Sequence, residues 1–302
     1  LGGSASHAAV AASFFAKTQL MGVVGGDFPT KYVRLFEKHG VCLKGLDRVK
    51  DGRTFHWSGE YEVNMNNRRT LNTVLGVIEN WSPKLPGDYE KTPYVLLANI
   101  SPSIQLAVLD QLSKPKFVIA DTMDLWLNIA LPDVLKLLKR VDCLVLNDSE
   151  ARQLVSDDNV VSALTKIHRM GPEYVIIKKG EHGSILSGPK GLFIAPAYPL
   201  RKVVDPTGAG DSFVGGLIGY LAAQKSGSIE TNLRRAILHG SVVASFCCEG
   251  FGLNVTTRTT KAQILARVKE LEKRCCRANL LVKQLLQPET ARHPLPSATT
   301  KN

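Results

Sequence analysis

A short glycine-rich stretch that ends in a carboxylate carries the residues of this sequence best suited to chemistry. Residues 203–213 read VVDPTGAGDSF and precede an apolar run that predicts a helix. A helix N-terminus presents unpaired backbone N–H groups and the positive end of the helix dipole. Gly208 and Gly210 have no Cβ, so the backbone there can come close to a bound anion. The pattern therefore predicts a phosphate-binding site.

Asp211 stands at the mouth of this site, where a carboxylate repels phosphate. Its place is explained if it meets a hydroxyl group instead. It would accept the proton as the hydroxyl oxygen attacks a γ-phosphorus, while the backbone around it stabilises charge on the transferring group. The spacing alone equally allows a plain helix cap, in which Asp211 only satisfies the first-turn amides.

The segment DPTGAGDSF closely resembles the C-terminal signature of the ribokinase-like (PfkB) family of small-molecule kinases, usually D-T-x-G-A-G-D-x-F. The resemblance runs from residue 1 to about 271 and is strongest to uncharacterised bacterial sugar kinases. It implies that Asp211 is the catalytic base and that the amides of Gly208, Ala209 and Gly210 form the anion hole. Asp205 and Thr207 belong to the nucleotide side of the same motif.

The family's activity is the expected function: an ATP-dependent phosphotransferase that moves the γ-phosphate to a hydroxyl of a sugar or sugar-like molecule. ATP and Mg²⁺ are the implied cofactors, and a monovalent cation near the glycine-rich loop is a further family property. A nucleoside kinase of the adenosine type is the near alternative. A catalytically silent relative that only binds ligand is an alternative of a different class.

Two further motifs resemble the nucleotide side of that family. Asn147 and Glu150 match an N-x-x-E motif, in which Glu150 positions magnesium and phosphate through water. Lys178, Gly180 and Gly183 match a strand followed by a turn at the nucleotide edge, with Lys178 where Thr or Ser is usual. The first motif also suits a helix N-terminus with acidic first-turn residues, and the second a simple turn between strands.

Residues expected near the acceptor come from the start of the chain and from strand ends. Gly2, Gly3 and His7 resemble a G-G-x-x-x-N motif, with His7 in place of Asn. In open α/β sheets ligands bind at the carboxyl ends of strands, which adds Asn99 and Asp121. His7 could equally be an ordinary helix residue. The remaining candidates are Asp27, which resembles a G-x-D motif or caps a helix, Asp124, which replaces an Asn, and His239, which lies against adenine or packs inside its helix.

The elements that must position these residues alternate along the chain. Short apolar runs rich in β-branched residues predict strands buried on both faces, and amphipathic stretches between them predict helices. The expected strands are Gln19–Val24, Tyr94–Ala98, Phe117–Ala120, Cys143–Leu146 and Tyr174–Ile177, and the expected helices are Ser4–Lys17, Thr30–His39, Ile104–Leu112, Pro132–Lys139 and Asn159–Arg169. The alternation predicts a doubly wound α/β fold with a mostly parallel sheet and helices on both faces.

A polar, alternating segment at about 53–74 predicts a small β flap with a turn at Asn66-Asn67. Its aromatic residues Phe55, Trp57 and Tyr61 would support a homodimer or pack on the main domain. From 205 onward the chain is expected to be helical, over Ala209–Ala223, Ile229–Phe246 and Lys261–Arg274. The kinase domain is placed at 1–275, and 276–302 is expected to be a disordered tail.

The family normally begins with a strand and a substrate-binding Asp before the glycine pair. The sequence as given starts at that pair, so a central strand and a substrate ligand are expected to be missing from it.

Composition narrows the function classes. The 302 residues carry a net charge of +11, but Lys and Arg are scattered without interleaved aromatic residues, which favours small anionic substrates over nucleic acid. No run of about 18 apolar residues predicts a membrane span. Six cysteines without CxxC spacing predict neither a zinc site nor a disulfide framework. A cytoplasmic protein with reduced thiols is expected.

Overall fold

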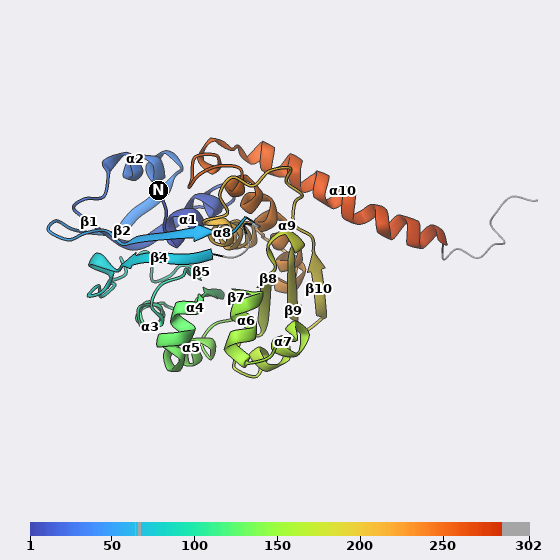
Figure 1. Cartoon of the computed structure of the whole chain (residues 1–302), viewed down its shortest axis with the longest axis horizontal. Coiled ribbons are helices and arrows are strands. Elements are labelled where there is room, and N and C mark those ends of the chain that lie inside the picture. The colour runs from blue at the N-terminus through green and yellow to red at the C-terminus, as the bar shows by residue number, and fades with distance from the viewer. Residues whose placement is uncertain (64, 66–67, 286–302) are drawn as a thin grey trace, which may run out of the picture.

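The computed structural model describes residues 1–63, 65 and 68–285, with side chains up to Arg274 except that of Arg68 (Figure 1). Its main sheet has six strands in the order β10-β9-β8-β7-β6-β5. β5 to β8 run parallel, whereas β9 and β10 are antiparallel to their neighbours. The strands are β5 (Tyr94–Leu97), β6 (Phe117–Asp121), β7 (Cys143–Asn147), β8 (Tyr174–Lys178), β9 (Ser184–Gly188) and β10 (Gly191–Ala195).

Helices cover both faces of this sheet because the central strands are apolar on both sides. In β6, Val118 and Ala120 join the core under one helical layer, whereas Phe117 and Ile119 join the core under the other. The first layer contains α3 (Pro102–Leu109), α4 (Asp124–Ile129), α5 (Leu131–Leu138), α6 (Asp148–Val155) and α7 (Val160–His168), and the second contains α8 (Ala209–Ala222) and α9 (Ile229–Cys248). The predicted doubly wound α/β fold is confirmed.

The main sheet stops at β5. Beyond it, β1 (Thr18–Gly25) and β2 (Val41–Val49) form a separate parallel pair, with α2 (Thr30–Lys38) between them in sequence. A cavity of about 1260 Å³ lies between, lined by residues 94–98 on one side, 19–24 on the other, and residues of α1 (Ser4–Ser13) and α3. Thr92 Oγ1 donates to Gln19 Oε1 (2.6 Å) where both strands begin. One further strand would be needed to make the sheet continuous.

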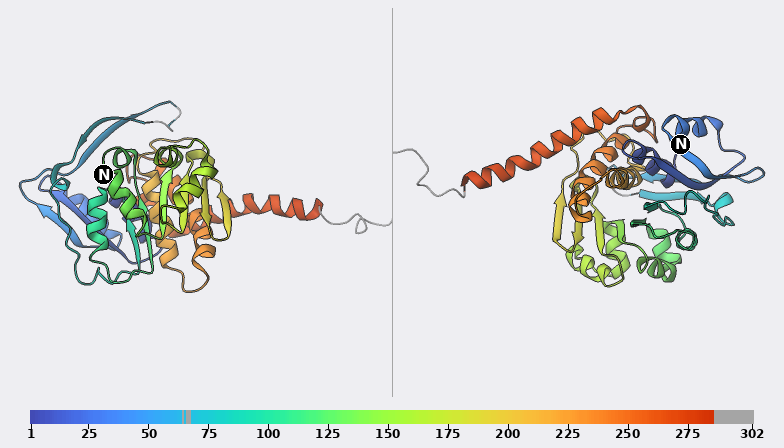
Figure 2. Two further views of the ribbon diagram at one scale, coloured as in Figure 1. Left: turned by 90° about the horizontal axis from the view of Figure 1, so that it is seen from below. Right: turned by 180° about the vertical axis from the view of Figure 1, so that it is seen from behind.

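The flap is a hairpin of β3 (His56–Tyr61) and β4 (Arg68–Val74), and it arches over one side of the molecule (Figure 2). Asp27 anchors its start, because Thr54 donates to Asp27 Oδ1 from both its backbone N (2.8 Å) and its Oγ1 (2.6 Å). These bonds lower the pKa of the Asp27 carboxyl. Asp27 therefore holds the flap rather than capping α2, which begins after Pro29 without a side-chain cap. The predicted turn at 66–67 lies outside the described residues.

Helix α8 lies directly on α1. A Cβ on Gly215 would lie 2.5 Å from Ala8 Cα, and one on Gly219 would lie 2.7 Å from Ala12 Cα. Two helices can approach this closely only where side chains are absent. The contact fixes the start of α1 beside the loop that precedes α8.

Several boundaries differ from the predictions. α1 ends at Ser13, and residues 14–16 turn into β1. β2 was not predicted, because Lys44 and Gly45 interrupt its apolar pattern. α10 (Lys261–Leu285) continues past the predicted end at Arg274 and projects away from the body of the molecule (Figure 1). The predicted boundary at 275 therefore falls inside this helix, and the disordered tail stays a prediction, because residues 286–302 lie outside the described range.

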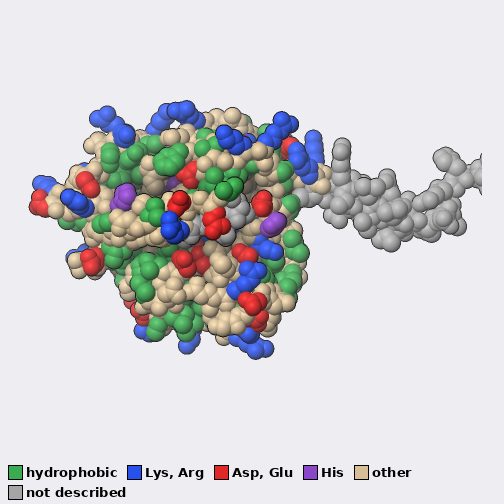
Figure 3. All heavy atoms as spheres, in the orientation of Figure 1, with side chains coloured by type: hydrophobic (Ala, Val, Ile, Leu, Met, Phe, Trp, Pro, Cys, Tyr) green, Lys and Arg blue, Asp and Glu red, His purple; other side chains and the backbone are tan. Residues whose placement is uncertain are grey.

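The surface agrees with a scattered basic charge: on the face shown in Figure 3, Lys and Arg side chains are interspersed with Asp and Glu. No helix within the described range is long and apolar enough to cross a membrane. Cys42, Cys143, Cys247 and Cys248 are free thiols.

Candidate active site

The glycine-rich loop turns into α8 as predicted. Gly208 has φ +81°, a left-handed conformation that suits glycine, and α8 starts at the next residue. Thr207 N donates to Asp205 Oδ1 (2.9 Å), and Ala209 N donates to Pro206 O (3.0 Å). These two hydrogen bonds close the loop into a turn. The Ala209 amide is one of the three amides expected in the anion hole, but it already donates a hydrogen bond within the turn.

Asp211 lies half-buried in the first turn of α8. Next to it, Lys178 Nζ lies 3.1 Å from where a Cβ on Gly210 would stand, so the ammonium group rests on the open side of that glycine. A cation and a helix N-terminus thus meet at the position where the sequence predicts a phosphate site.

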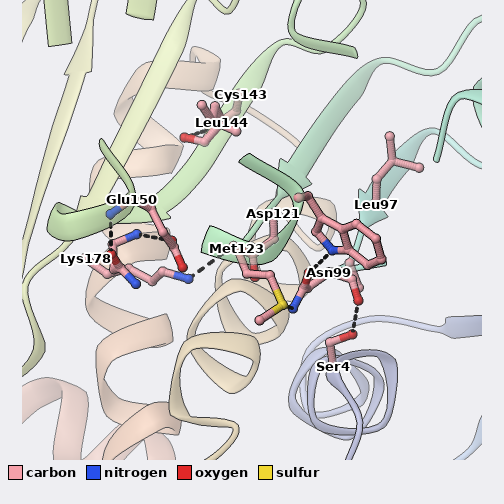
Figure 4. A network of polar contacts seen from close by, with 12 residues as sticks. Ser4, Leu97, Asn99, Asp121, Met123, Cys143, Leu144, Glu150 and Lys178 are labelled. Carbon is pink, nitrogen blue, oxygen red and sulfur yellow. Dashed lines mark hydrogen bonds and ion pairs between the residues drawn. The ribbon is translucent and has the colours of Figure 1, made fainter. Parts of the chain in front are cut away.

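Lys178 ends β8 and Asp121 ends β6, and the two side chains form an ion pair of 3.2 Å (Figure 4). Both are largely buried. Burial acts to lower the pKa of Lys178, but the charges of Asp121, Glu150 and Asp211 outweigh it and raise that pKa. Burial raises the pKa of the Asp121 carboxyl, and Asp211 adds to the effect, while Lys178 opposes it.

Asn147 and Glu150 form a capping box at the start of α6. Glu150 N donates to Asn147 Oδ1 (2.8 Å), and Asn147 N donates to Glu150 Oε2 (2.8 Å). This is the helix-end interpretation that the sequence left open. Glu150 is buried and still raises the pKa of Lys178, so it also belongs to the charged group at the ends of β6, β7 and β8.

His7 lies under the glycine-rich loop. A Cβ on Gly208 would lie 2.5 Å from His7 Nε2, so the ring packs directly against that glycine. His7 Nδ1 is 3.5 Å from Ser212 Oγ and 3.6 Å from Cys247 Sγ, whereas Nε2 has no partner among the described residues. Burial lowers the pKa of His7 to about 4, so the ring is neutral at pH 7. Cys247 was not predicted, because no local sequence signal links positions 240 residues apart.

Of the other predicted acceptor residues, Gly2, Gly3 and Asn99 line the large cavity, as does Asp27, whereas Asp121 is not among its lining residues. Asn99 is held from both ends: Trp126 Nε1 donates to its Oδ1 (2.9 Å), and Ser4 Oγ donates to its backbone O (2.9 Å). Figure 4 shows Asn99 close to α1, which carries Ser4. Asp124 is exposed in the first turn of α4.

The flap reaches the glycine-rich loop. Thr207 Oγ1 donates to the hydroxyl of Tyr61 at 3.3 Å, although the two residues are 146 positions apart. Phe55, Trp57 and Tyr61 all line the cavity, so the flap aromatic residues face the interior of the site. The sequence predicted a flap but not this contact.

Gly180 and Gly183 lie in the turn between β8 and β9, with φ +54° and +85°. This is the turn that the sequence also allowed. A Cβ on Gly183 would lie 2.8 Å from Ala197 N, so the turn needs glycine for its own geometry.

His239, on α9, packs against aromatic residues. Its ring stacks on Tyr220 (3.8 Å between centroids) and meets Phe15 edge-on, and its Nδ1 is 2.9 Å from Arg235 O. It lies eight residues before Cys247 on α9, about 12 Å along the helix axis. This packing is the helix interpretation that the sequence also allowed, and contact of His239 with adenine stays a prediction.

Comparison with known proteins agrees with this geometry. The profile described as pfkB family carbohydrate kinase matches residues 1–260. The chain belongs to this family. A cytidine kinase of Thermococcus kodakarensis is 29% identical over 228 residues, which cover 72% of this chain and 80% of that protein. A bifunctional ribokinase/ribose-5-phosphate isomerase A of Fructilactobacillus sanfranciscensis is 34% identical over 132 residues, or 42% of this chain and 23% of that protein.

Solved structures share the fold. The nucleoside kinase of Methanocaldococcus jannaschii, a member of the ribokinase family, superposes with a TM-score of 0.73 at 20% identity, covering 89% of this chain and 86% of that one. The Arabidopsis thaliana ribokinase complexed with ribose and ATP gives 0.70 at 23% identity, covering 89% and 87%. As a member of the pfkB family the chain is a small-molecule kinase, an ATP-dependent phosphotransferase acting on a sugar or nucleoside hydroxyl.

Proposed function

We propose that Asp211 is the general base of this transfer. It takes the proton of the acceptor hydroxyl as that oxygen attacks the γ-phosphorus. The observation that carries the proposal is the position of Asp211 in the first turn of α8, beside the Gly208–Gly210 loop and within the field of Lys178. Positioned base assistance typically contributes ~10²–10⁴-fold.

The nucleotide phosphates would lie at the N-terminus of α8. The backbone at Gly208 and Gly210 faces them, Lys178 supplies positive charge, and Asp205 holds the loop through Thr207. Ala209 joins this anion hole only if its turn bond to Pro206 lengthens. Gly180 and Gly183 shape the turn beside the adenosine side.

Magnesium suits this charged group. Mg²⁺ keeps several waters and is held mainly by phosphate oxygens and one or two carboxylates. Glu150 could hold such waters, and Asn147 fixes it in place. Within the described range no group of three His, Cys, Asp or Glu side chains is placed to hold a metal ion. A monovalent cation near the glycine-rich loop remains part of the proposal from the family resemblance.

The acceptor would occupy the cavity between the flap and the loop. Gly2, Gly3 and Asn99 line it, and His7 lies at its floor beside the loop. A nucleoside is the second candidate, because Phe55, Trp57 and Trp126 also line this cavity, and aromatic rings can stack on a base.

The deciding experiment is ADP release from ATP and Mg²⁺ across sugars, sugar phosphates and nucleosides, with Asp211→Asn alongside. We expect one class to be turned over, and Asp211→Asn to lose ~10²-fold or more in kcat. Nucleotide binding should persist in this variant. If the wild type binds an ATP analogue but turns over no acceptor, the silent relative is the correct function.

Dimerisation through the flap is also part of the proposal. Leu71 and Val74 on β4 are large apolar residues left exposed, at 58% and 39%. Sedimentation of Leu71→Lys against the wild type tests it: a dimer that becomes a monomer supports the flap interface, and an unchanged state contradicts it.

A further inference from the structure

Lys178 and Asp121 belong to strands that are not neighbours. β7 lies between β6 and β8, so the two strand ends are separated by about 10 Å at the usual strand spacing. The lysine must therefore extend across the end of β7 to reach the carboxylate at 3.2 Å. In this position the Lys178 Nζ lies beside Gly210, 3.1 Å from where a Cβ on that glycine would stand. The ammonium group thus lies between one carboxylate and the expected phosphate site.

The single positive charge of Lys178 lies within the influence of three carboxylates, so negative charge is in excess around it. Asp121, Glu150 and Asp211 all act on Lys178. Asp121 makes the direct pair, and both side chains are shielded from water, with 19% of the lysine and 6% of the aspartate side chain exposed. A phosphate group arriving at Gly210 would find the lysine within reach. A phosphate oxygen is also a strong acceptor for an ammonium donor.

We propose that Lys178 and Asp121 form an exchangeable pair. Asp121 holds the ammonium in the empty site, and Lys178 turns to the transferring phosphoryl group when nucleotide binds. Asp121 is then a positioning residue that acts through Lys178, not a ligand of the acceptor. This inference rests on the proposed function, because it places the phosphoryl group at the Gly208–Gly210 loop.

The exchange has a second consequence. Once the lysine has left, Asp121 remains buried at the end of β6 with Asp211 nearby, and both conditions favour its protonated form. The groups that face it are Lys178 and Asp211, with Glu150 facing the lysine. Nucleotide binding is therefore accompanied by uptake of a proton from solvent onto the Asp121 carboxylate.

The experiment is calorimetric titration of the whole chain with Mg²⁺ and the non-hydrolysable β,γ-imido analogue of ATP, in buffers of different ionisation enthalpy. The wild type should take up protons from the buffer when the analogue binds. Asp121→Asn should take up none and bind the analogue ~10-fold more tightly, because the competitor for Lys178 is gone. The KM of the acceptor should be unchanged in this variant.

The double variant Asp121→Asn/Lys178→Met removes both charges, which avoids leaving a buried carboxylate alone. It should bind the analogue ~10-fold or more weakly than the wild type, and the gain seen in Asp121→Asn should disappear. The matched control is Asp133→Asn/Lys136→Met, an exposed ion pair of 2.8 Å on α5, which should change neither affinity nor proton uptake.

Three results would overturn the exchange. The first is proton uptake in Asp121→Asn that equals that of the wild type. The second is an effect of Asp121→Asn on analogue affinity that is the same with and without Lys178. The third is an Asp121→Asn variant whose KM for the acceptor rises while its affinity for the analogue is unchanged. The proposed function fails differently: the wild type would bind the analogue with proton uptake but turn over no acceptor. A wild type that does not bind the analogue would refute both.

Discussion

Replacing Gly208 with alanine tests the closest contact under the glycine-rich loop. Its φ of +81° disfavours a residue with a Cβ, at a cost of ~1–2 kcal/mol. The new Cβ would also stand 2.5 Å from His7 Nε2, whereas non-bonded atoms pack at about 3.5–4.0 Å. The ring must move by ~1 Å, and such overpacking costs ~1–3 kcal/mol. We expect Gly208→Ala to lower the free energy of unfolding by ~2–5 kcal/mol.

Urea unfolding measures this loss, and two variants separate its parts. Gly191→Ala has a similar φ of +86° but open space around the new Cβ, so it isolates the backbone cost. In His7→Ala/Gly208→Ala the ring is absent, so about 1–3 kcal/mol should be recovered relative to the sum of the single changes. Because the loop is the proposed anion hole, kcat of Gly208→Ala should also fall by ~10²–10³-fold.

The reasoning is refuted if Gly208→Ala costs no more stability than Gly191→Ala. It is also refuted if removing the His7 ring recovers nothing. Either result would mean that the loop can move off the histidine without loss.

Three further results are expected. Gly215→Ala should lower the free energy of unfolding by ~1–3 kcal/mol, measured in urea, because its Cβ would stand 2.5 Å from Ala8 Cα. In the unfolded chain His7 takes up a proton near pH 6.5, whereas in the folded chain burial lowers its pKa to about 4. The free energy of unfolding should therefore fall by ~3 kcal/mol as the pH drops from 6.5 to 4. Tyr61→Phe should lower kcat/KM by ~2–13-fold, because the hydrogen bond from Thr207 is lost.

Each of these has its own control. Gly87→Ala introduces a Cβ with nothing within 4 Å and should leave stability unchanged. For the pH effect, His7→Asn should flatten the difference between pH 7 and pH 4, and a full loss in that variant would assign the effect to other groups. Glu60→Gln removes a different flap contact, the exposed ion pair with Arg69, and separates general loosening of the flap from the contact with the loop.

The central sheet could be predicted because its strands are buried on both faces. A run such as Phe117–Asp121 leaves no position for water, so it reads as a strand from composition alone. The glycine-rich loop was predictable from residue type, because a positive φ and a close approach of another group to the backbone both favour glycine. β2, which pairs with β1, could not be predicted from composition, because Lys44 and Gly45 interrupt its apolar pattern.

The candidate site was harder to predict where one residue type serves two purposes. Asn147 and Glu150 suit a metal site and a helix cap equally well in sequence, and the structure shows that they do form the cap. His239 has the chemistry of a ligand, but its stacking on Tyr220 depends on the packing of α8 against α9. Such long-range contacts leave no periodic pattern in the sequence.

The cavity between β5 and β1 has a consequence for what can bind there. Two strand edges face each other across it without a ladder of hydrogen bonds between them, and unpaired edges pair with extended chains. An extended segment of about five or six residues, the usual length of a strand, would therefore join β1 and β2 to the main sheet by pairing with both edges.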